Sequence, residues 1–370
     1  MPSARLLIST ANLERNYKLI QKYIGNKVIY PVVKANAYGI GIEFVLPILL
    51  KSGIKTICVA KAFEGQDIRK INSDLKILVF EPSILESDIN IICKNNLIAS
   101  VTSVKQCQMF LAKAKQLKIK IKISIMVETG FYRYGASLTE VDKIQNLVKN
   151  SQYIKIHSIY SHLACSDSLK DSCLVLSQIQ ILNTVAEKIN APMHIFSSSG
   201  IINYKKHIQK IVRAGAILYG AWPSSTLREK NKKLLDIKSV GTLQGMITEI
   251  KHIKTGSSVG YGHTWQAQND CYIAVIAAGY AYGIPRDLSN KGYVLLNGKK
   301  LPIIGRVSMD SCTVLLGEDN SQQLIGQWVT FWGEDKTGKV IEPDEVAAAA
   351  GTCVHEILSA VPDRVQRVLV

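Results

Sequence analysis

The 370-residue sequence lacks the features that mark several large classes of protein. Its longest uncharged apolar stretch, residues 272–285, is interrupted by glycine and proline and is too short for a transmembrane helix. The N-terminal segment has no apolar core of the kind a secretory signal peptide needs. Charged residues make up only 20% of the chain, so a largely disordered protein is excluded. The composition therefore predicts a folded globular protein with no membrane partner.

The eight cysteines contain no C-x-x-C pair, and no zinc-finger spacing is present. Several lie in apolar runs, as Cys58 does, where cysteine acts as a small hydrophobic residue. This usage is typical of a reducing compartment. We therefore expect a cytoplasmic protein without disulfide bonds and without a bound metal.

Acidic residues are scarce relative to basic ones: 29 Asp and Glu stand against 45 Lys and Arg, a net charge of +16. Such a balance can indicate nucleic acid, a membrane surface or an anionic ligand as partner. The lysines are scattered along the chain, and no nucleic-acid-binding motif accompanies them. We expect no nucleic-acid partner.

Short β-branched runs alternate with amphipathic stretches over the first 220 residues, which is typical of βα units and a parallel sheet. The expected strands are Val28–Lys34, Thr56–Ala60, Ile77–Phe80, Leu97–Val101, Ile119–Val127, Ile154–His162, Met193–Phe196 and Ile211–Val212. The expected helices are Ala11–Tyr23, Ile42–Leu50, Ala62–Lys70, Val104–Leu117, Leu138–Lys149 and Ser168–Ile189. Eight strands fit a closed (β/α)8 TIM-like barrel. An open doubly wound sheet is the alternative, but the glycine-rich first turn G-x-G-x-x-G is absent.

The pattern changes after Tyr219. The stretch Trp222–Lys238 is polar and rich in lysine, and we interpret it as a connection. From Val240 onward, short apolar runs separated by Gly and Asn-Gly turns indicate a mostly-β domain, closed by one helix at Pro343–Ala350. The predicted domains are 1–233, the barrel, and 234–370, the β-rich domain.

Lys34 ends an apolar run in the segment 31–39 (PVVKANAYG). Lysine is uncommon there, because a buried ammonium group needs compensation. At the carboxyl end of a barrel strand the position favours catalysis, and a neutral lysine amine can bond to an aldehyde. Taken alone, Lys34 could equally be a strand-end residue that reaches solvent.

Two motifs together carry a resemblance over essentially the whole chain. The segment around Lys34 and the segment 305–310 (GRVSMD) stand in the order and at the separation found in the alanine racemase family, which the chain resembles. The resemblance implies a cytoplasmic isomerase that binds pyridoxal 5'-phosphate in a TIM barrel and interconverts L- and D-alanine. It also implies that the D-alanine serves peptidoglycan synthesis.

The resemblance assigns the cofactor to named residues. Lys34 is expected to hold the aldehyde, Arg213 to face the pyridine nitrogen, and His162 to stack on the ring. Arg133 is expected near the phenolic oxygen and the substrate carboxylate. The expected phosphate ligands are Tyr38, Ser198 with Ser199 as the alternative hydroxyl, the amides of Gly215 and Ala216, and His355.

The resemblance also supplies a second base and a partner. Tyr261, between two glycines, is expected to act on the cofactor of the other subunit, which makes a homodimer part of the chemistry. A two-base mechanism follows, with Tyr261 serving the L-enantiomer and Lys34 the D-enantiomer. Met309 and Tyr280 are expected to contact the amino-acid substrate, with Asp310 supporting them.

Three positions depart from the family pattern. Met126 stands where a lysine that orients Arg133 is usual, His355 replaces a tyrosine, and Tyr282 replaces an aspartate. A racemase for another amino acid or for several is therefore one alternative. A related barrel decarboxylase and a regulatory protein without activity are the others. The β-rich region that carries Tyr261 and Met309 argues against the last.

Overall fold

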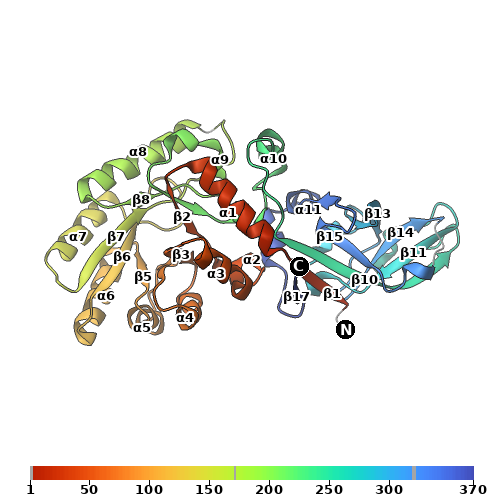
Figure 1. Cartoon of the computed structure of the whole chain (residues 1–370), viewed down its shortest axis with the longest axis horizontal. Coiled ribbons are helices and arrows are strands. Elements are labelled where there is room, and N and C mark those ends of the chain that lie inside the picture. Colours follow the sequence, from red (N-terminus) through yellow and green to blue (C-terminus); the bar gives the residue numbers. More distant parts are fainter. Residues whose placement is uncertain (1–2, 171, 319–321) are drawn as a thin grey trace. The chain divides into compact units, whose positions relative to one another are not determined.

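The computed structural model describes residues 3–170, 172–318 and 322–370 (Figure 1). The chain forms two compact units, each assembled from stretches that are not adjacent in sequence. The barrel unit contains Lys18–Ala37 and Leu49–Gly215. The β unit contains Tyr38–Ile48, Ala216–Val370 and the N-terminal segment that ends at Tyr17. The predicted division into 1–233 and 234–370 stays a prediction.

The barrel unit is built on eight parallel strands, and all eight predicted runs are confirmed. They are β2 (Val28–Pro31), β3 (Thr56–Val59), β4 (Lys76–Val79), β5 (Ile98–Val101), β6 (Ile121–Met126), β7 (Ile154–Tyr160), β8 (Met193–His194) and β9 (Ile211–Ala214). Strands β3 to β8 form one sheet in chain order, and β2 pairs with β9. A bridge between Val32 and Cys58 joins β2 to β3, and the amide of Arg213 donates to the carbonyl of Phe196 after β8 at 2.9 Å. These links close the ring, so the predicted TIM-like barrel is confirmed.

The helices of this part of the chain are α1 (Thr10–Ile24), α3 (Ile42–Lys51), α4 (Ala62–Ile71), α5 (Glu86–Lys94), α6 (Val104–Leu117), α7 (Leu138–Lys149), α8 (Ser172–Ile189) and α9 (Ser198–Asn203). Helix α1 precedes the first barrel strand, and the others follow or separate the barrel strands. Helix α6 begins where Ser103 caps its first turn, and α7 begins at a capping box made by Ser137 and Glu140. No helix of the described residues is long and apolar enough to cross a membrane.

Helix α5 was not predicted from the sequence. Its apolar residues are concentrated in the run 89–93, which resembles a short strand. In the structure Ile89, Ile92 and Cys93 are buried together, at the i, i+3, i+4 spacing of one helix face. Burial of that face against the barrel therefore outweighs the local preference of isoleucine for strands.

The β unit contains a nine-stranded sheet. Its strands are β1 (Ala4–Ile8), β10 (Gly241–Ile253), β11 (Cys271–Ile276), β12 (Tyr293–Leu296), β13 (Lys299–Ile304), β14 (Cys312–Gly317), β15 (Trp328–Glu334), β16 (Val340–Ile341) and β17 (Gln366–Leu369). The sheet is antiparallel except where β1 pairs with β17. The mostly-β prediction is confirmed, but β10 is a 13-residue strand rather than a short one. Its length lets it pair with β1, β11 and β15. Bulges interrupt its pairing with β11 and with β15, and they allow the strand to bend.

Two further helices correct the sequence prediction for the β unit. The stretch 222–238, expected to be a connection, contains α10 (Ser225–Asn231), capped by the Ser224 side chain. A second helix, α12 (Val354–Ser359), follows the predicted α11 (Pro343–Ala350). Both additional helices are under eight residues long, so their sequence periodicity was too short to recognise.

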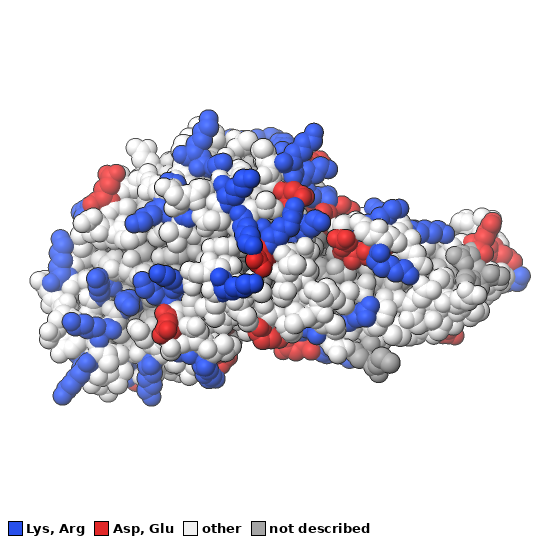
Figure 2. Space-filling model, in the orientation of Figure 1, with Lys and Arg blue, Asp and Glu red and all other residues white. Residues whose placement is uncertain are grey.

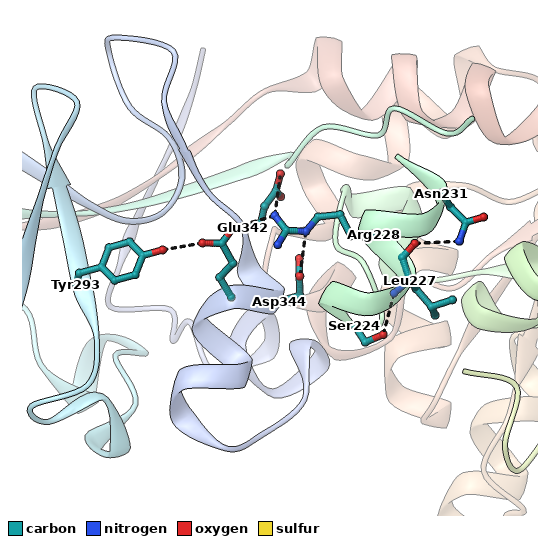
Figure 3. A network of polar contacts seen from close by, with 8 residues as sticks. Ser224, Leu227, Arg228, Asn231, Tyr293, Glu342 and Asp344 are labelled. Carbon is teal, nitrogen blue, oxygen red and sulfur yellow. Dashed lines mark hydrogen bonds and ion pairs between the residues drawn. The ribbon is translucent and has the colours of Figure 1, made fainter. Parts of the chain in front are cut away.

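Helix α10 is fixed to the start of α11 by an ion-pair network (Figure 3). The Arg228 guanidinium lies 2.8 Å from Glu345, 3.2 Å from Asp344 and 3.9 Å from Glu342. Tyr293 on β12 donates its hydroxyl to Glu345 at 2.6 Å. One cation thus faces three carboxylates, all of which precede or lie in the first turn of α11, where the helix dipole favours negative charge.

Nearly all of the excess of basic over acidic residues lies in the barrel unit. By sequence this unit holds 27 Lys and Arg against 12 Asp and Glu, whereas the β unit holds 18 against 17. Figure 2 shows basic side chains spread over the barrel unit with few acidic ones between them. The overall composition does not reveal this uneven distribution of basic residues between the two units.

Candidate active site

Lys34 begins a left-handed turn at the end of β2. Residues 35–38, labelled within α2 (Lys34–Tyr38) in Figure 1, all have φ between 52° and 56°, and none is glycine. A left-handed conformation costs about 1–2 kcal/mol for each such residue. The turn therefore requires fixed contacts, which include a hydrogen bond from the Ala35 amide to Glu64 Oε1 at 2.6 Å.

Packing against α12 fixes the exit from this turn in the β unit. Gly39 has φ of +77°, and a Cβ there would lie 2.3 Å from the carbonyl oxygen of Leu358. Only glycine fits both the backbone angle and this contact. The Arg367 guanidinium also donates to the Gly39 carbonyl, at 2.8 Å and 3.1 Å.

The Lys34 amine lies in a cationic and partly buried environment. Burial lowers its pKa, and the guanidinium of Arg133 lowers it further. The Glu64 carboxylate opposes this effect, while Arg213 adds to it. A lysine with a lowered pKa is more often neutral, and only the neutral amine is a nucleophile or a base.

Arg213 is buried on β9 and is held by two neighbouring strands. Its Nη1 donates to His194 at Nδ1 and at the carbonyl oxygen, both at 2.7 Å. Its Nη2 donates to the Ser161 carbonyl at 2.8 Å and lies 3.3 Å from His162 Nδ1. These contacts fix the guanidinium plane and bring the predicted residues Arg213 and His162 together.

His194 belongs to the same arrangement, although the sequence did not single it out. Burial lowers its pKa well below the usual value, and Arg213 adds to this effect. Its ring stacks on Tyr160, with centroids 5.1 Å apart. A neutral imidazole can accept a hydrogen bond from Arg213. His194 can therefore orient the guanidinium group without repelling its positive charge.

The loop after β6 places Arg133. Glu128 accepts backbone hydrogen bonds from Gly130, Phe131 and Tyr132, at 2.5, 2.8 and 3.0 Å. The Arg133 guanidinium lies over the Phe131 ring at 4.5 Å. No carboxylate among the described residues forms an ion pair with Arg133.

Phe131 also contacts His162, edge to face, with centroids 5.3 Å apart. Met126, the departure from the family pattern on β6, is buried, with 4% of its surface exposed. The structure thus places Phe131, which the sequence reasoning missed, between two predicted site residues.

Ser198 and Ser199 open the short helix α9, directly after β8. Ser198 is buried and Ser199 is partly exposed. Gly215 follows β9, and Ala216 begins the 3-10 turn η2 (Ala216–Tyr219). Hydroxyl groups and backbone amides at such starts are suited to binding an anion.

In the β unit, Tyr38 stacks near two other rings. Its centroid lies 4.9 Å from that of Tyr219 and 5.9 Å from that of His355 on α12. Tyr219 is fully buried, whereas His355 is exposed. The structure therefore joins Tyr38 and His355, two of the predicted phosphate ligands.

Tyr261 projects from the β unit, in the 3-10 turn η3 (Tyr261–His263). Its side chain is 70% exposed. The Arg306 guanidinium, from the segment 305–310, lies against the neighbouring Gly262. Tyr261 is therefore largely exposed on a glycine-flanked turn.

Tyr280 and Met309 are brought together by their backbones. The Tyr280 amide donates to the carbonyl of Ser308 at 3.0 Å, and the Ala281 amide donates to that of Met309 at 2.9 Å. A Cβ at Gly279 would lie 2.1 Å from the Ser308 oxygen, so this approach requires glycine.

Asp310 lies 3.5 Å from Arg364, whose guanidinium also stacks on the Tyr282 ring at 4.4 Å. Tyr282, the departure at a usual aspartate position, thus contacts Arg364 through its ring. The structure connects the predicted supporting residue Asp310 to this departure through a single arginine.

Comparison with known proteins matches both units. A family model described as alanine racemase, N-terminal domain, matches residues 8–223, and one described as alanine racemase, C-terminal domain, matches residues 240–369. An alanine racemase of Haemophilus influenzae is 33% identical over 359 residues, covering 97% of this chain and 96% of the relative. One of Clostridium novyi is 31% identical, covering 98% and 94%.

A solved structure of the alanine racemase from Bartonella henselae, described with covalently bound pyridoxal phosphate, has a TM-score of 0.89. It is 26% identical and covers 100% of both chains. The likeness therefore extends over the whole length of this chain.

Proposed function

The chain belongs to the alanine racemase family, and we propose that it interconverts L- and D-alanine with pyridoxal 5'-phosphate as its cofactor. The observation that carries the proposal is the environment of Lys34. A lysine at the end of a barrel strand, with its pKa lowered by burial and by Arg133, is the group that an aldehyde cofactor needs. The full-length relatives named alanine racemase support the substrate.

The residues present fit the cofactor by their chemistry. Lys34 would hold the aldehyde, and Arg213 would donate a hydrogen bond to the pyridine nitrogen. Arginine keeps its proton at working pH, so that nitrogen would stay unprotonated. The phosphate would take hydroxyl, amide and imidazole donors from Tyr38, Ser198, Ser199, Gly215, Ala216 and His355.

Two residues would move the α-proton. When bound, pyridoxal phosphate supplies the electron sink that stabilises the negative charge left at the α-carbon. Tyr261 would remove the proton of L-alanine and Lys34 would deliver one to the opposite face, with the roles reversed for D-alanine. The lowered pKa of Lys34 suits a base that must be neutral for one direction and protonated for the other.

The substrate carboxylate would be bound by Arg133 and by the backbone amide of Met309, with Tyr280 alongside. Arg133 forms no ion pair with a carboxylate of the described residues, so its charge is available to an anion. Its position is set by Phe131 and by the Glu128-anchored loop instead of by residue 126.

A homodimer is part of the proposal. Tyr261 and Met309 are 70% and 53% exposed in the β unit, and Ile84 and Tyr132, in loops after β4 and β6 of the barrel unit, are 66% and 88% exposed. A second copy would cover them and bring its Tyr261 to the Lys34 of the first.

A cytoplasmic location and a supply of D-alanine for peptidoglycan complete the proposal. All eight cysteines are free in the structure, which supports a reducing compartment. The use of the product is an expectation from the resemblance alone.

Chemical trapping tests the cofactor assignment. Borohydride treatment of the protein purified with pyridoxal 5'-phosphate should fix the cofactor to the peptide that contains Lys34, as read by mass spectrometry. Lys34→Ala should lose both the label and the visible absorbance, because no other amine takes its place. Label on a different lysine would contradict the assignment.

A further inference from the structure

The carboxylate of Glu64 joins the ends of two neighbouring barrel strands. Glu64 lies in the first turn of α4, and its Oε1 accepts the Ala35 amide at 2.6 Å, just after β2 and Lys34. Its Oε2 accepts the amides of Ala60 and Lys61 at 2.8 and 2.9 Å, just after β3. One side chain thus satisfies three backbone donors at the rim where Lys34 lies.

The first of these bonds acts on the left-handed turn. Residues 35–38 hold a conformation that L-amino acids avoid, and such conformations persist only where their surroundings fix them. The Ala35 amide is the first donor of the turn, and the Ala37 amide bonds back to the Val33 carbonyl at 3.0 Å. Glu64 therefore fixes the residue that directly follows Lys34.

The charge of Glu64 acts on the amine itself. Burial and the charges of Arg133 and Arg213 lower the pKa of the Lys34 amine, and the charge of Glu64 raises it. The two guanidinium groups favour the neutral amine, and the carboxylate favours the ammonium form. An amine that must alternate between the two forms requires a balance of this kind.

We propose that Glu64 is the positioning residue for Lys34: its carboxylate joins the turn that carries the lysine to the end of β3, and its negative charge opposes the positive charges of Arg133 and Arg213. The inference rests on the proposed function, because it takes Lys34 as the cofactor lysine. Glu64 lies outside both sequence motifs and was not among the site residues expected from the sequence.

Two variants separate the hydrogen bonds from the charge. Glu64→Gln keeps the length, removes the charge, and turns an NH2 group toward backbone donors. Glu64→Asp keeps the charge but is too short to reach both strand ends. Asp67→Asn is the matched control, because Asp67 lies on the same helix and its carboxylate is bound to exposed Lys70 at 2.7 Å.

Two measurements are made on each protein. Titration with pyridoxal 5'-phosphate, followed by visible absorbance, gives the affinity for the cofactor. Competitive acetylation of the cofactor-free protein, followed by mass spectrometry, gives the pKa of the Lys34 amine. Glu64→Gln should weaken cofactor affinity at least about tenfold and lower the pKa of Lys34. Glu64→Asp should weaken the affinity and leave that pKa close to the wild-type value.

An affinity and a Lys34 pKa in Glu64→Gln that equal those of Asp67→Asn would overturn the proposal. So would a loss of affinity with no change in that pKa, since it would indicate a general structural role. If Glu64→Gln does not fold, wild-type affinity in Glu64→Asp overturns it. A wild-type protein that binds no pyridoxal 5'-phosphate would overturn the proposed function first, and this inference with it.

Discussion

Lys34 and Tyr261, the two proposed bases, occupy contrasting environments. Lys34 is partly buried among charged groups that act on its pKa, whereas Tyr261 is mostly exposed on a turn of the β unit. The first is arranged by its own subunit. Under the proposed mechanism, the second acts on the cofactor of a partner subunit.

Removing the Tyr261 hydroxyl should affect the two enantiomers unequally. Tyr261→Phe should slow exchange of the α-proton of L-alanine at least about a hundredfold, the usual contribution of a positioned acid or base. Exchange from D-alanine, which depends on Lys34, should fall far less. Isotope exchange into each enantiomer, followed by NMR in deuterated water, measures both. Equal losses would refute the two-base assignment.

At the residue scale, the sequence pointed to the groups proposed to act chemically but not to the residues that hold them. Lys34 could be singled out because it ends an apolar run, whereas Arg213 was expected only from the family resemblance. Glu64, Phe131 and His194 act through contacts between segments far apart in the chain, which no local pattern records. A partial signal existed only for Glu64, which lies three residues into a helix that follows a strand.

At the element scale, the barrel was predictable because buried parallel strands are continuous apolar runs with a helix between them. The short helices α5, α10 and α12 were not, because their periodicity is brief and their stability comes from tertiary contacts. For α10 the contact is the Arg228 network, in which burial raises the pKa of Glu342 to about 7 and of Asp344 to about 6.

The Arg228 network predicts a pH-dependent stability. Both acids have folded pKa values above their usual 4.5 and 3.8, so the folded state binds more protons between about pH 4 and pH 7. The contribution of these two acids to the free energy of unfolding therefore falls as pH rises through that window. The positive charge of Arg228 reduces this fall by stabilising the ionised carboxylates. Arg228→Met should lower the unfolding temperature more at pH 8 than at pH 5, with a cost of roughly 3 kcal/mol at the higher pH.

Arg15→Met is the control for that variant, because Arg15 pairs with Asp236 in an exposed position and should have little effect at either pH. Melting curves at both pH values provide the comparison. A loss of unfolding temperature in Arg228→Met that is the same at pH 5 and pH 8 would exclude the network as the cause.

At the scale of the whole molecule, the proposed site draws on both units. Lys34, Arg133, His162 and Arg213 belong to the barrel unit, whereas Tyr261 belongs to the β unit. The α/β character of the first part of the chain and the mostly-β character of the second could be predicted from the sequence. The assignment of Tyr38 to the β unit could not. That assignment depends on how Gly39 packs against α12.

A shared site predicts complementation between inactive subunits. Lys34→Ala and Tyr261→Phe should each be nearly inactive in the L-to-D direction. Exchanging subunits between them should restore about one quarter of wild-type activity, because half of the dimers are mixed and each mixed dimer has one intact site. A chain carrying both substitutions is the control. No recovery despite mixed dimers on native mass spectrometry would place both residues in one subunit.

The approach of each alanine enantiomer to equilibrium tests the central claim most directly. The protein, supplied with pyridoxal 5'-phosphate, is incubated separately with L-alanine and D-alanine, and circular dichroism follows the amino acid. The account predicts that both circular dichroism signals decay to zero while the total alanine concentration is conserved. With Lys34→Ala, both signals should stay at their starting values. Persistent signals from a protein that has bound the cofactor would contradict alanine racemisation.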